Sequence, residues 1–269
     1  MWLKTKNSKT RVFSGLTAVV VLLALGAIPA NASNDNSSTS LAPVIPDIPC
    51  CGGGGPVWGI DSVNTVNSTW LPQITSQLGA PVIVGQYLDT GSGQHLTSSQ
   101  ASYIHGQGIS IFLLYSPLNA SLVGSTAANS DAAKAVSEAK TAGAQPNSGI
   151  AIYRDVEEAY SVNSAYVNAW YTAITDAGYI PAFYENSFAG QFESAFCGAG
   201  SSTISGTYLY ASELHSGSSY LEIHAPATYN PYYVACESFS QMSGWQYLTG
   251  GAVSGHSIDV DEYAQVGLY

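Results

Sequence analysis

Positive charge is scarce in this 269-residue chain, which has 7 Lys and Arg residues against 18 Asp and Glu residues. After Arg11 the only cations are Lys134, Lys140 and Arg154. Proteins bind nucleic acids and anionic membranes mainly through Lys and Arg side chains. Such an acidic chain is a poor candidate for either partner, and we expect no nucleic-acid partner.

Motifs for several kinds of catalysis are also missing. None of the 5 histidines belongs to an H-E-x-x-H pattern or to another paired ligand spacing, so we predict no metal and no other cofactor. The sequence has no G-x-S-x-G elbow and no phosphate-binding loop. These absences argue against a serine hydrolase of that type and against nucleotide-dependent chemistry.

The amino-terminal region has the pattern of a secretory signal peptide over residues 1–32. Basic residues up to Arg11 precede an apolar stretch from Gly15 to Ile28, and Ala30-Asn31-Ala32 resembles a cleavage site. The apolar stretch, about 14 residues long, is short for a membrane span of roughly 20 residues. We therefore expect export, cleavage, no stable membrane insertion afterwards, and a location outside the cell or on its wall.

Cysteine is rare, with 4 residues in the chain, and an exported protein favours their oxidation. Cys197 and Cys236 would close a loop of about 40 residues, a crosslink worth roughly 4 kcal/mol, and we predict this disulfide. The adjacent Cys50 and Cys51 lie in PCCGGGGP. They could pair with each other, with another chain, or stay reduced.

The remaining chain divides into a linker and one domain. Residues 33–56 are rich in Ser, Asn, Pro and Gly and have no apolar periodicity, which is typical of a linker. Residues 57–269 contain short apolar runs that alternate with helical patterns. We predict strands at 57–61, 81–88, 109–115, 149–157, 180–186, 207–214, 244–248 and 257–263.

This alternation predicts an α/β fold with parallel crossovers, a modified (β/α)8 TIM-like barrel. An open doubly wound sheet is the alternative, although no glycine-rich dinucleotide fingerprint follows the first strand. The chain ends too soon after Tyr263 for a full final helix. The helical pattern is weak from Ser212 to Ser243, so we expect an irregular later half.

Helix signals support the same architecture. Thr97 and Gln100 have the spacing of a capping box, and two helical patterns end at glycines. The helices expected from these signals and from apolar periodicity are 70–78, the segment after Thr97, 131–142 and 163–177.

Acidic residues collect at the carboxyl ends of the expected strands, where barrels of this type carry their active sites. They are Asp61, Asp89, Asp155, Glu157, Glu185, Glu213, Asp259 and Asp261. Asp155 and Glu157 are two residues apart, so on a strand both point to one face. Two carboxyl groups at this spacing can be held at different pKa values, which glycoside cleavage requires.

Other charged residues near the strand ends have simpler interpretations. Asp89, Glu158 and Glu262 fit helix capping or a solvated rim. Arg154 would point away from Asp155 toward the helix layer. A lone buried cation there needs a carboxylate, so we expect a structural ion pair.

Aromatic side chains accompany the acids and suggest a carbohydrate groove, because sugar rings pack on aromatic planes. The predicted substrate-binding residues are Tyr87, Tyr115, Tyr153, Tyr184, Glu185, Trp245 and Gln246. Each aromatic residue alone is more often part of a core.

Five segments together resemble a known bacterial family. They are GID (59–61), LTSSQ and GISIFLLY (97–101 and 108–115), IAIYRDVEEAY (150–160), and WQYL with a final DVDEY (245–248 and 259–263). This combination resembles the glycoside-hydrolase-like family known as domain of unknown function 1906, a relative of the family 25 lysozymes. The resemblance covers the chain from Val57 to its end.

The resemblance implies a modified barrel, export, and action on bacterial cell-wall glycan. It makes Glu157 the general acid and Asp155 the carboxylate that stabilises an oxazolinium formed by the substrate's own N-acetyl group. Asp61 matches the first-strand acid of the lysozyme relatives, and Asp259 or Asp261 matches the late acid.

The sequence thus predicts a secreted, monomeric glycoside hydrolase that cuts β-1,4 links in peptidoglycan. The alternative is a wall-bound glycan-binding module that keeps the barrel without turnover. A chitinase-like enzyme is disfavoured, because the longer D-x-x-D-x-D-x-E run is absent.

Overall fold

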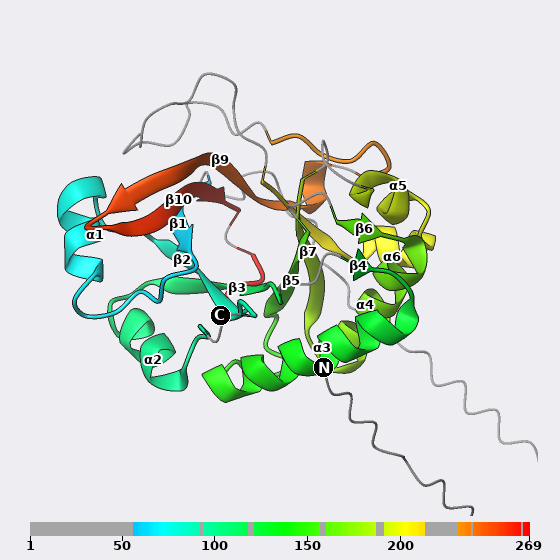
Figure 1. The fold of residues 1–269 in the computed structure, drawn as a ribbon, viewed down its shortest axis with the longest axis horizontal. Helices are drawn as coiled ribbons and strands as arrows, with labels where there is room; N and C mark the ends of the chain where they lie inside the picture. Colours follow the sequence, from blue (N-terminus) through cyan, green and yellow to red (C-terminus); the bar gives the residue numbers. More distant parts are fainter. Residues whose placement is uncertain are drawn as a thin grey trace, which may run out of the picture. The chain divides into compact units, whose positions relative to one another are not determined.

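The computed structural model describes residues 56–91, 94–117, 121–156, 160–186, 191–212, 231–237, 239–264 and 266–269. Within these residues eight strands close a barrel in the order β1-β10-β9-β8-β7-β5-β3-β2 (Figure 1). The barrel strands are β1 (Val57–Ser62), β2 (Ile83–Asp89), β3 (Ser110–Tyr115), β5 (Ala151–Val156), β7 (Ile180–Glu185), β8 (Tyr208–Ala211), β9 (Met242–Val253) and β10 (His256–Tyr263). Each predicted strand is present, which confirms the α/β barrel.

The last strand departs from the expected parallel arrangement. β10 is antiparallel to both β9 and β1, whereas the other neighbouring barrel strands are parallel. Only Ser254 and Gly255 separate β9 from β10, and both have positive φ angles, of 54° and 84°. A two-residue loop allows only a hairpin, because a parallel crossover needs about a dozen residues or more.

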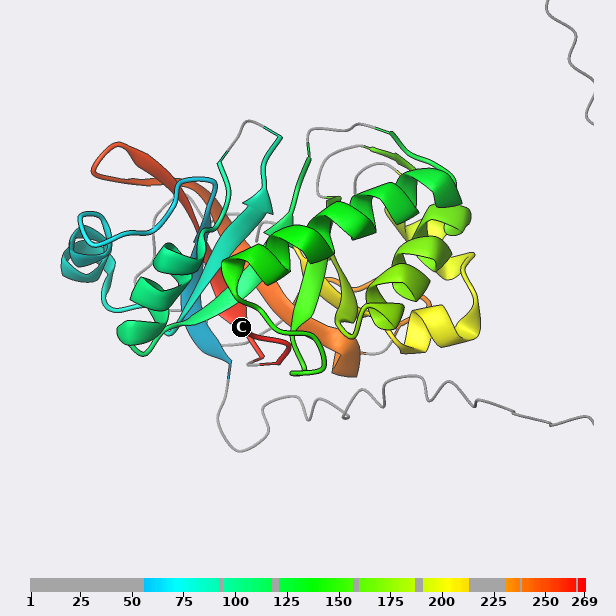
Figure 2. The ribbon, with the colours of Figure 1, turned by 90° about the horizontal axis from the view of Figure 1, so that it is seen from below.

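Helices cover the outer side of the barrel between the strands. They are α1 (Leu71–Leu78), α2 (Ser98–Gly106), α3 (Ser125–Ala142), α4 (Ser164–Asp176), α5 (Phe192–Cys197), α6 (Ser201–Ser205) and the 3-10 turn η1 (Phe239–Gln241). α3 and α4 lie side by side across β5 and β7 (Figure 2). Two short strands, β4 (Ser121–Leu122) and β6 (Ser161–Val162), pair in parallel beyond the ends of β3 and β5.

Local sequence accounts for the helix ends. Thr97 and Gln100 form the predicted capping box at the start of α2. Gly143 ends α3 with a left-handed φ of 104°. α3 itself begins at Ser125, earlier than the predicted start at Asp131, because the apolar spacing of its alanines continues toward the amino terminus.

The later half is irregular, as expected. Segment 231–237 has no helix, and it is tied to α5 by a disulfide between Cys197 and Cys236, whose Cα atoms are 5.5 Å apart. The structure therefore contains the predicted crosslink. The predicted signal peptide, the linker and the Cys50–Cys51 pair lie outside the described residues.

Apolar residues form two clusters, one on each side of the barrel wall. The outer cluster packs the strands against the helices and includes Trp170, Phe183 and Phe196. The inner cluster fills the barrel and is rich in tyrosine, with Phe112 in ring contact with Tyr153. Alternation along each strand decides which side chain joins which cluster.

No helix within the described ranges has the length and apolar character needed to span a membrane.

Candidate functional site

Three predicted acids lie on the inner side of the barrel wall. Asp61 from β1, Asp155 from β5 and Asp261 from β10 are 1%, 4% and 0% exposed. Their strand neighbours at odd positions, such as Tyr153 and Tyr263, belong to the inner cluster. The closed barrel thus places on one side of its wall carboxyl groups that are far apart in sequence.

Asp61 is held by a tyrosine and by a close backbone approach. The Tyr184 hydroxyl donates to Asp61 Oδ2 at 3.2 Å and also contacts Gln246. Asp61 is opposite Gly85 in the register with β2, and a Cβ on Gly85 would lie 2.4 Å from the Asp61 Cβ. Because glycine has no Cβ, Gly85 leaves room for the Asp61 side chain on the neighbouring strand.

Asp261 lies deeper and has two phenol partners. Tyr210 Oη donates to Asp261 Oδ1 at 2.5 Å, and Tyr263 Oη donates to Oδ2 at 3.3 Å. Burial raises the pKa of Asp261 well above its ordinary value, and the nearby charge of Asp259 adds to the rise. The two phenol hydrogen bonds oppose it without cancelling it.

The phenols around Asp261 stay protonated as donors. Burial raises the pKa of both Tyr210 and Tyr263, and the Asp261 charge raises both further. Neither tyrosine was among the predicted site residues. The signal was present in the sequence, because Tyr263 follows Asp261 at the two-residue spacing of one strand face.

Asp259 lies closer to the end of the barrel than Asp261 does. It is half-buried and stands opposite Asp61 in the pairing of β10 with β1. Its Oδ1 accepts from the Gly250 backbone N–H at 2.8 Å. The antiparallel direction of β10 therefore still places Asp259 at the same end as Asp61.

The predicted aromatic residues separate into two groups. Tyr87, Tyr153 and Tyr184 belong to the inner cluster, on the side of the acids. Tyr115 and Trp245 belong to the outer cluster, where Tyr115 stacks on Trp170 with ring centroids 6.2 Å apart. The structure does not bring Tyr115 and Trp245 together with the acids.

The structure does not place two predicted glutamates, Glu157 and Glu185, beside the inner aspartates. Glu157 lies outside the described residues, so only its position directly after Val156, the last residue of β5, is fixed. Glu185 is fully buried and alternates with the inward-facing Tyr184, which puts it on the outer side with Phe183. Glu185 is thus separated from the inner acids by the barrel wall.

Glu237 is a buried acid that the sequence interpretation missed. It follows the disulfide residue Cys236 and is 9% exposed, and neither carboxyl oxygen has a hydrogen-bond partner in the described part of the chain. Burial and the charge of Glu185 raise its pKa well above the ordinary value. Segment 231–237 has no helix or strand, so no apolar periodicity in the sequence could have indicated that Glu237 is buried.

Glu262 corrects the expectation of a solvated rim, because it is only 2% exposed. It alternates with Asp261 and lies opposite Trp58 and Trp245 in the sheet. Burial raises its pKa from 4.5 to about 7. Asp89 does not cap a helix, because Thr97 is the N-cap of α2. Asp89 is partly exposed at the end of β2, and its Oδ1 accepts from the Gly91 N–H in a turn at 2.6 Å.

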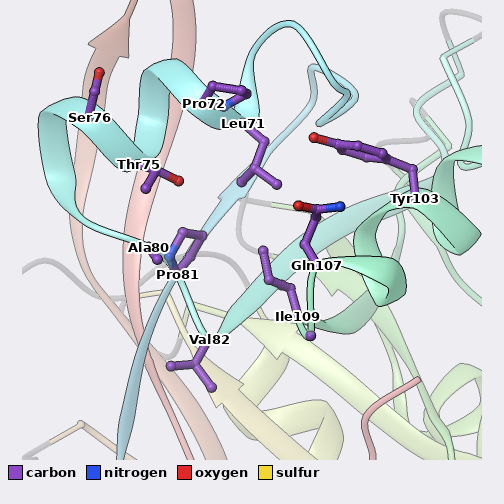
Figure 3. Close-up of a pocket in the computed structure, with 11 residues that line it drawn as sticks. Leu71, Pro72, Thr75, Ser76, Ala80, Pro81, Val82, Tyr103, Gln107 and Ile109 are labelled. Atoms are coloured by element: carbon purple, nitrogen blue, oxygen red, sulfur yellow. The ribbon is translucent and has the colours of Figure 1, made fainter.

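A pocket of about 550 Å³ lies away from these acids, between α1 and α2. In Figure 3, Leu71 and Ile109 point into it from opposite sides, and the ring of Tyr103 closes a third side. Val82 and Ile109 precede β2 and β3, so the pocket is at the amino ends of these strands. That end of such barrels generally serves stability rather than chemistry.

The sequence comparison decides the family. Residues 81–263 match the model described as Rv2525c-like, glycoside hydrolase-like domain. The chain belongs to this family. The resemblance inferred from the sequence segments is thereby confirmed, and no match was found among curated proteins.

Solved structures share the fold of this glycoside hydrolase-like domain. An uncharacterized B. stearothermophilus protein has 23% identity and a TM-score of 0.71, over 79% of this chain and 100% of that protein. The Mycobacterium tuberculosis Tat-secreted protein Rv2525c, in complex with L-tartrate, has 20% identity and a TM-score of 0.54, over 79% and 98%. A bacterial lysozyme from Streptomyces coelicolor has 12% identity and a TM-score of 0.51, over 77% and 91%.

The site of this glycoside hydrolase-like domain holds buried acids with phenol partners. Burial raises the pKa of Asp261 and so favours its neutral form, and Asp61 accepts a hydrogen bond from the Tyr184 hydroxyl. Among the described residues no group of three or more His, Cys, Asp and Glu side chains is arranged to hold a metal ion. The arrangement suits acid–base chemistry by carboxyl groups.

Proposed function

We propose that this protein hydrolyses the β-1,4 glycosidic bonds of bacterial cell-wall peptidoglycan. The observation that carries the proposal is the gathering of Asp61, Asp155 and Asp261 inside one barrel, with phenol hydroxyls on two of them. The family of glycoside hydrolase-like domains and the lysozyme fold likeness support the same chemistry.

Glu157 is the general acid in this proposal, and Asp155 is its partner. Glu157 gives its proton to the glycosidic oxygen as the bond from that oxygen to sugar C1 breaks. The carbonyl oxygen of the substrate's N-acetyl group bonds to C1, and Asp155 stabilises the resulting oxazolinium. Glu157 then takes a proton from water as the water oxygen bonds to C1 and the bond from the acetyl oxygen to C1 breaks, which restores the N-acetyl group.

The remaining acids and the inner aromatics hold the sugar. We assign Asp61 and Asp259 to positioning, since they face each other across β1 and β10. Tyr184 lies beside Asp155 in the register of β7 with β5, and Tyr87 shares its side of the wall. Tyr115 and Trp245 are left out of the binding set, because they pack in the outer cluster.

The proposal includes export. The predicted signal peptide favours it, and the structural neighbour Rv2525c is described as Tat-secreted. We propose that the mature chain acts as a monomer on the cell wall.

The test is the release of new reducing ends from purified peptidoglycan by the mature chain, from about pH 3 to about pH 8. We expect release by the natural chain and its loss in Glu157→Gln. The matched control is Glu138→Gln on α3, which should keep the activity.

If neither the natural chain nor Glu157→Gln releases reducing ends, while both stay folded and bind the wall, turnover is excluded. The glycan-binding module would then be the function.

A further inference from the structure

Arg154 is a fully buried cation on the outer side of β5, and its guanidinium contacts the backbone of the candidate site. Nη1 donates to the Asp155 carbonyl oxygen at 2.7 Å and to the Tyr115 carbonyl oxygen at 3.2 Å. These carbonyls belong to the carboxyl ends of β5 and β3, which are neighbours in the barrel. One guanidinium therefore joins two adjacent strand ends where the acids lie.

Two helices hold Arg154 in this place. Arg154 Nε donates to Tyr166 Oη of α4 at 3.0 Å, and it lies 3.6 Å from Asp131 Oδ2 of α3. Tyr166 Oη in turn donates to the same Asp131 oxygen at 2.7 Å. These contacts confirm the predicted structural ion pair. They show that Arg154 has both a carboxylate and a phenol as partners.

The contacts keep Arg154 charged. Burial lowers its pKa, but Tyr166, Asp131 and Asp155 together raise the pKa above the ordinary value. The guanidinium also lies 5.7 Å from the centre of the Tyr115 ring. A charged, planar group with several fixed donors is suited to holding carbonyls at set positions.

The position of Asp155 is what this network fixes. Asp155 is on the inner side, and its own carbonyl is held from the outer side by Arg154. Catalytic carboxyl groups must be placed to within a fraction of an ångström, and a displacement of about 1 Å can lower a rate by about 100-fold. A rigid bond to the peptide of Asp155 therefore has a direct consequence for its carboxyl group.

We propose that Arg154 is a positioning residue for Asp155, supported from outside the barrel by Asp131 and Tyr166. The inference rests on the proposed function, because it assigns a role within that same site. It goes beyond stabilisation of the strand, since it predicts an effect on turnover that is separable from the effect on folding.

Tyr166→Phe is the variant that tests the inference, because it removes one hydroxyl and leaves Arg154 and Asp131 in place. The matched control is Tyr179→Phe. Tyr179 is also buried, and its hydroxyl donates to the Ala144 carbonyl at 2.8 Å, at the other end of β7. Tyr166→Phe loses two buried hydrogen bonds and Tyr179→Phe loses one, so both variants should lose Tm and Tyr166→Phe should lose more.

We expect Tyr166→Phe to lower kcat on peptidoglycan by about 10-fold with KM within about twofold, because transition-state placement is affected more than binding. Tyr179→Phe should keep both constants within about twofold. Arg154→Lys should lower kcat further, since lysine keeps the charge and loses the planar set of donors. Equal kcat values for the natural chain and Tyr166→Phe would overturn the inference.

A second readout does not need turnover. The ¹³Cγ resonance of Asp155, assigned by its loss in Asp155→Asn, should shift in Tyr166→Phe and stay in place in Tyr179→Phe, at one fixed pH. If the natural chain releases no reducing ends, the proposed function fails while this resonance still decides the positioning role. An unmoved resonance in Tyr166→Phe would overturn that role.

Discussion

Buried acids on the two sides of the barrel wall differ in their surroundings. Inside, Asp61 and Asp261 receive hydrogen bonds from tyrosine hydroxyls. On the outer side, Glu262 Oε2 is buried without a hydrogen-bond partner in the described chain, and Glu237 on its stapled segment lacks one for both oxygens. Burial raises the pKa of Asp261, Glu237 and Glu262 alike, but only Asp261 has donors that counteract the rise.

This difference separates two uses of a buried carboxyl group. A group with fixed donors keeps a defined orientation and can serve chemistry. A group without donors is held neutral by its surroundings and lowers stability once the pH favours its ionised form. We therefore expect the inner acids to govern activity and the outer acids to affect only the pH dependence of folding, to which Asp261 also contributes through its raised pKa.

The largest expected effect concerns activity. Asp155→Asn should lower the rate of reducing-end release by about 10²- to 10⁴-fold, because it removes the carboxyl group that stabilises the oxazolinium in the proposed mechanism. Glu237→Gln should leave that rate within about twofold. Initial rates of both variants are measured on the same peptidoglycan. An equal loss of rate in both would contradict the division between inner and outer acids.

Removal of the disulfide should have the next largest effect. The crosslink joins residues 39 positions apart, so replacing Cys197 and Cys236 by Ser should lower the free energy of unfolding by about 4 kcal/mol at acid pH. The loss should be smaller at neutral pH, because release of segment 231–237 lets Glu237 ionise in water. Urea unfolding at both pH values measures the difference, and an equal loss at both would argue against strain from Glu237.

Glu262 should make the protein more stable in acid than at neutral pH. Its pKa is 4.5 ordinarily and about 7 in the fold, so between these values the folded state keeps a proton that the unfolded state releases. The free energy of unfolding therefore falls as the pH rises from 4.5 to about 7, and Glu262 adds no further change above that.

Glu262→Gln should reduce this slope, leaving the part that Glu237 and Asp261 contribute, and raise stability near pH 7 by on the order of 1–3 kcal/mol. Thermal unfolding of the natural chain and of Glu262→Gln across the pH range measures the change in stability. Asp176→Asn, at the exposed end of α4, is the control and should keep the slope. An unchanged slope in Glu262→Gln would assign the whole pH dependence to other groups.

The smallest expected effect is at a phenol of the inner network. Tyr210→Phe should lower the free energy of unfolding by about 1 kcal/mol, since it removes the hydroxyl that donates to Asp261. Tyr103→Phe, on a half-buried residue beside the pocket, should change stability by less. Urea denaturation of both variants makes the comparison, and equal stabilities would show that Asp261 does not depend on this donor.

Much of the barrel could be predicted from the sequence, because apolar runs and helix caps are local signals. The eight runs became the eight barrel strands, and Thr97 with Gln100 became a capping box. The need of Arg154 for a carboxylate also followed from burial alone. Its identity as Asp131 did not, since that contact depends on how α3 crosses β5.

The orientation of side chains was harder to predict than the strands themselves. Tyr115 and Trp245 have the same local pattern as Tyr153, yet they face the helices. Strands in such a barrel are buried on both sides, so hydrophobicity cannot tell the inner side from the outer. The direction of β10 was set by the two-residue turn at Ser254 and Gly255, a signal that the alternation of strands and helices obscured.

The sequence by itself determined the strands, the main helix ends, the cysteine pair and the family, because these depend on local spacing and on residue identity. Only the tertiary structure decided which acids share the interior of the barrel. Closing the barrel placed Asp61, Asp155 and Asp261 on one side of a wall, and Glu185 and Glu262 on the other. The physical reason is that strand alternation fixes opposite faces, while only closure of the sheet decides which face becomes the interior.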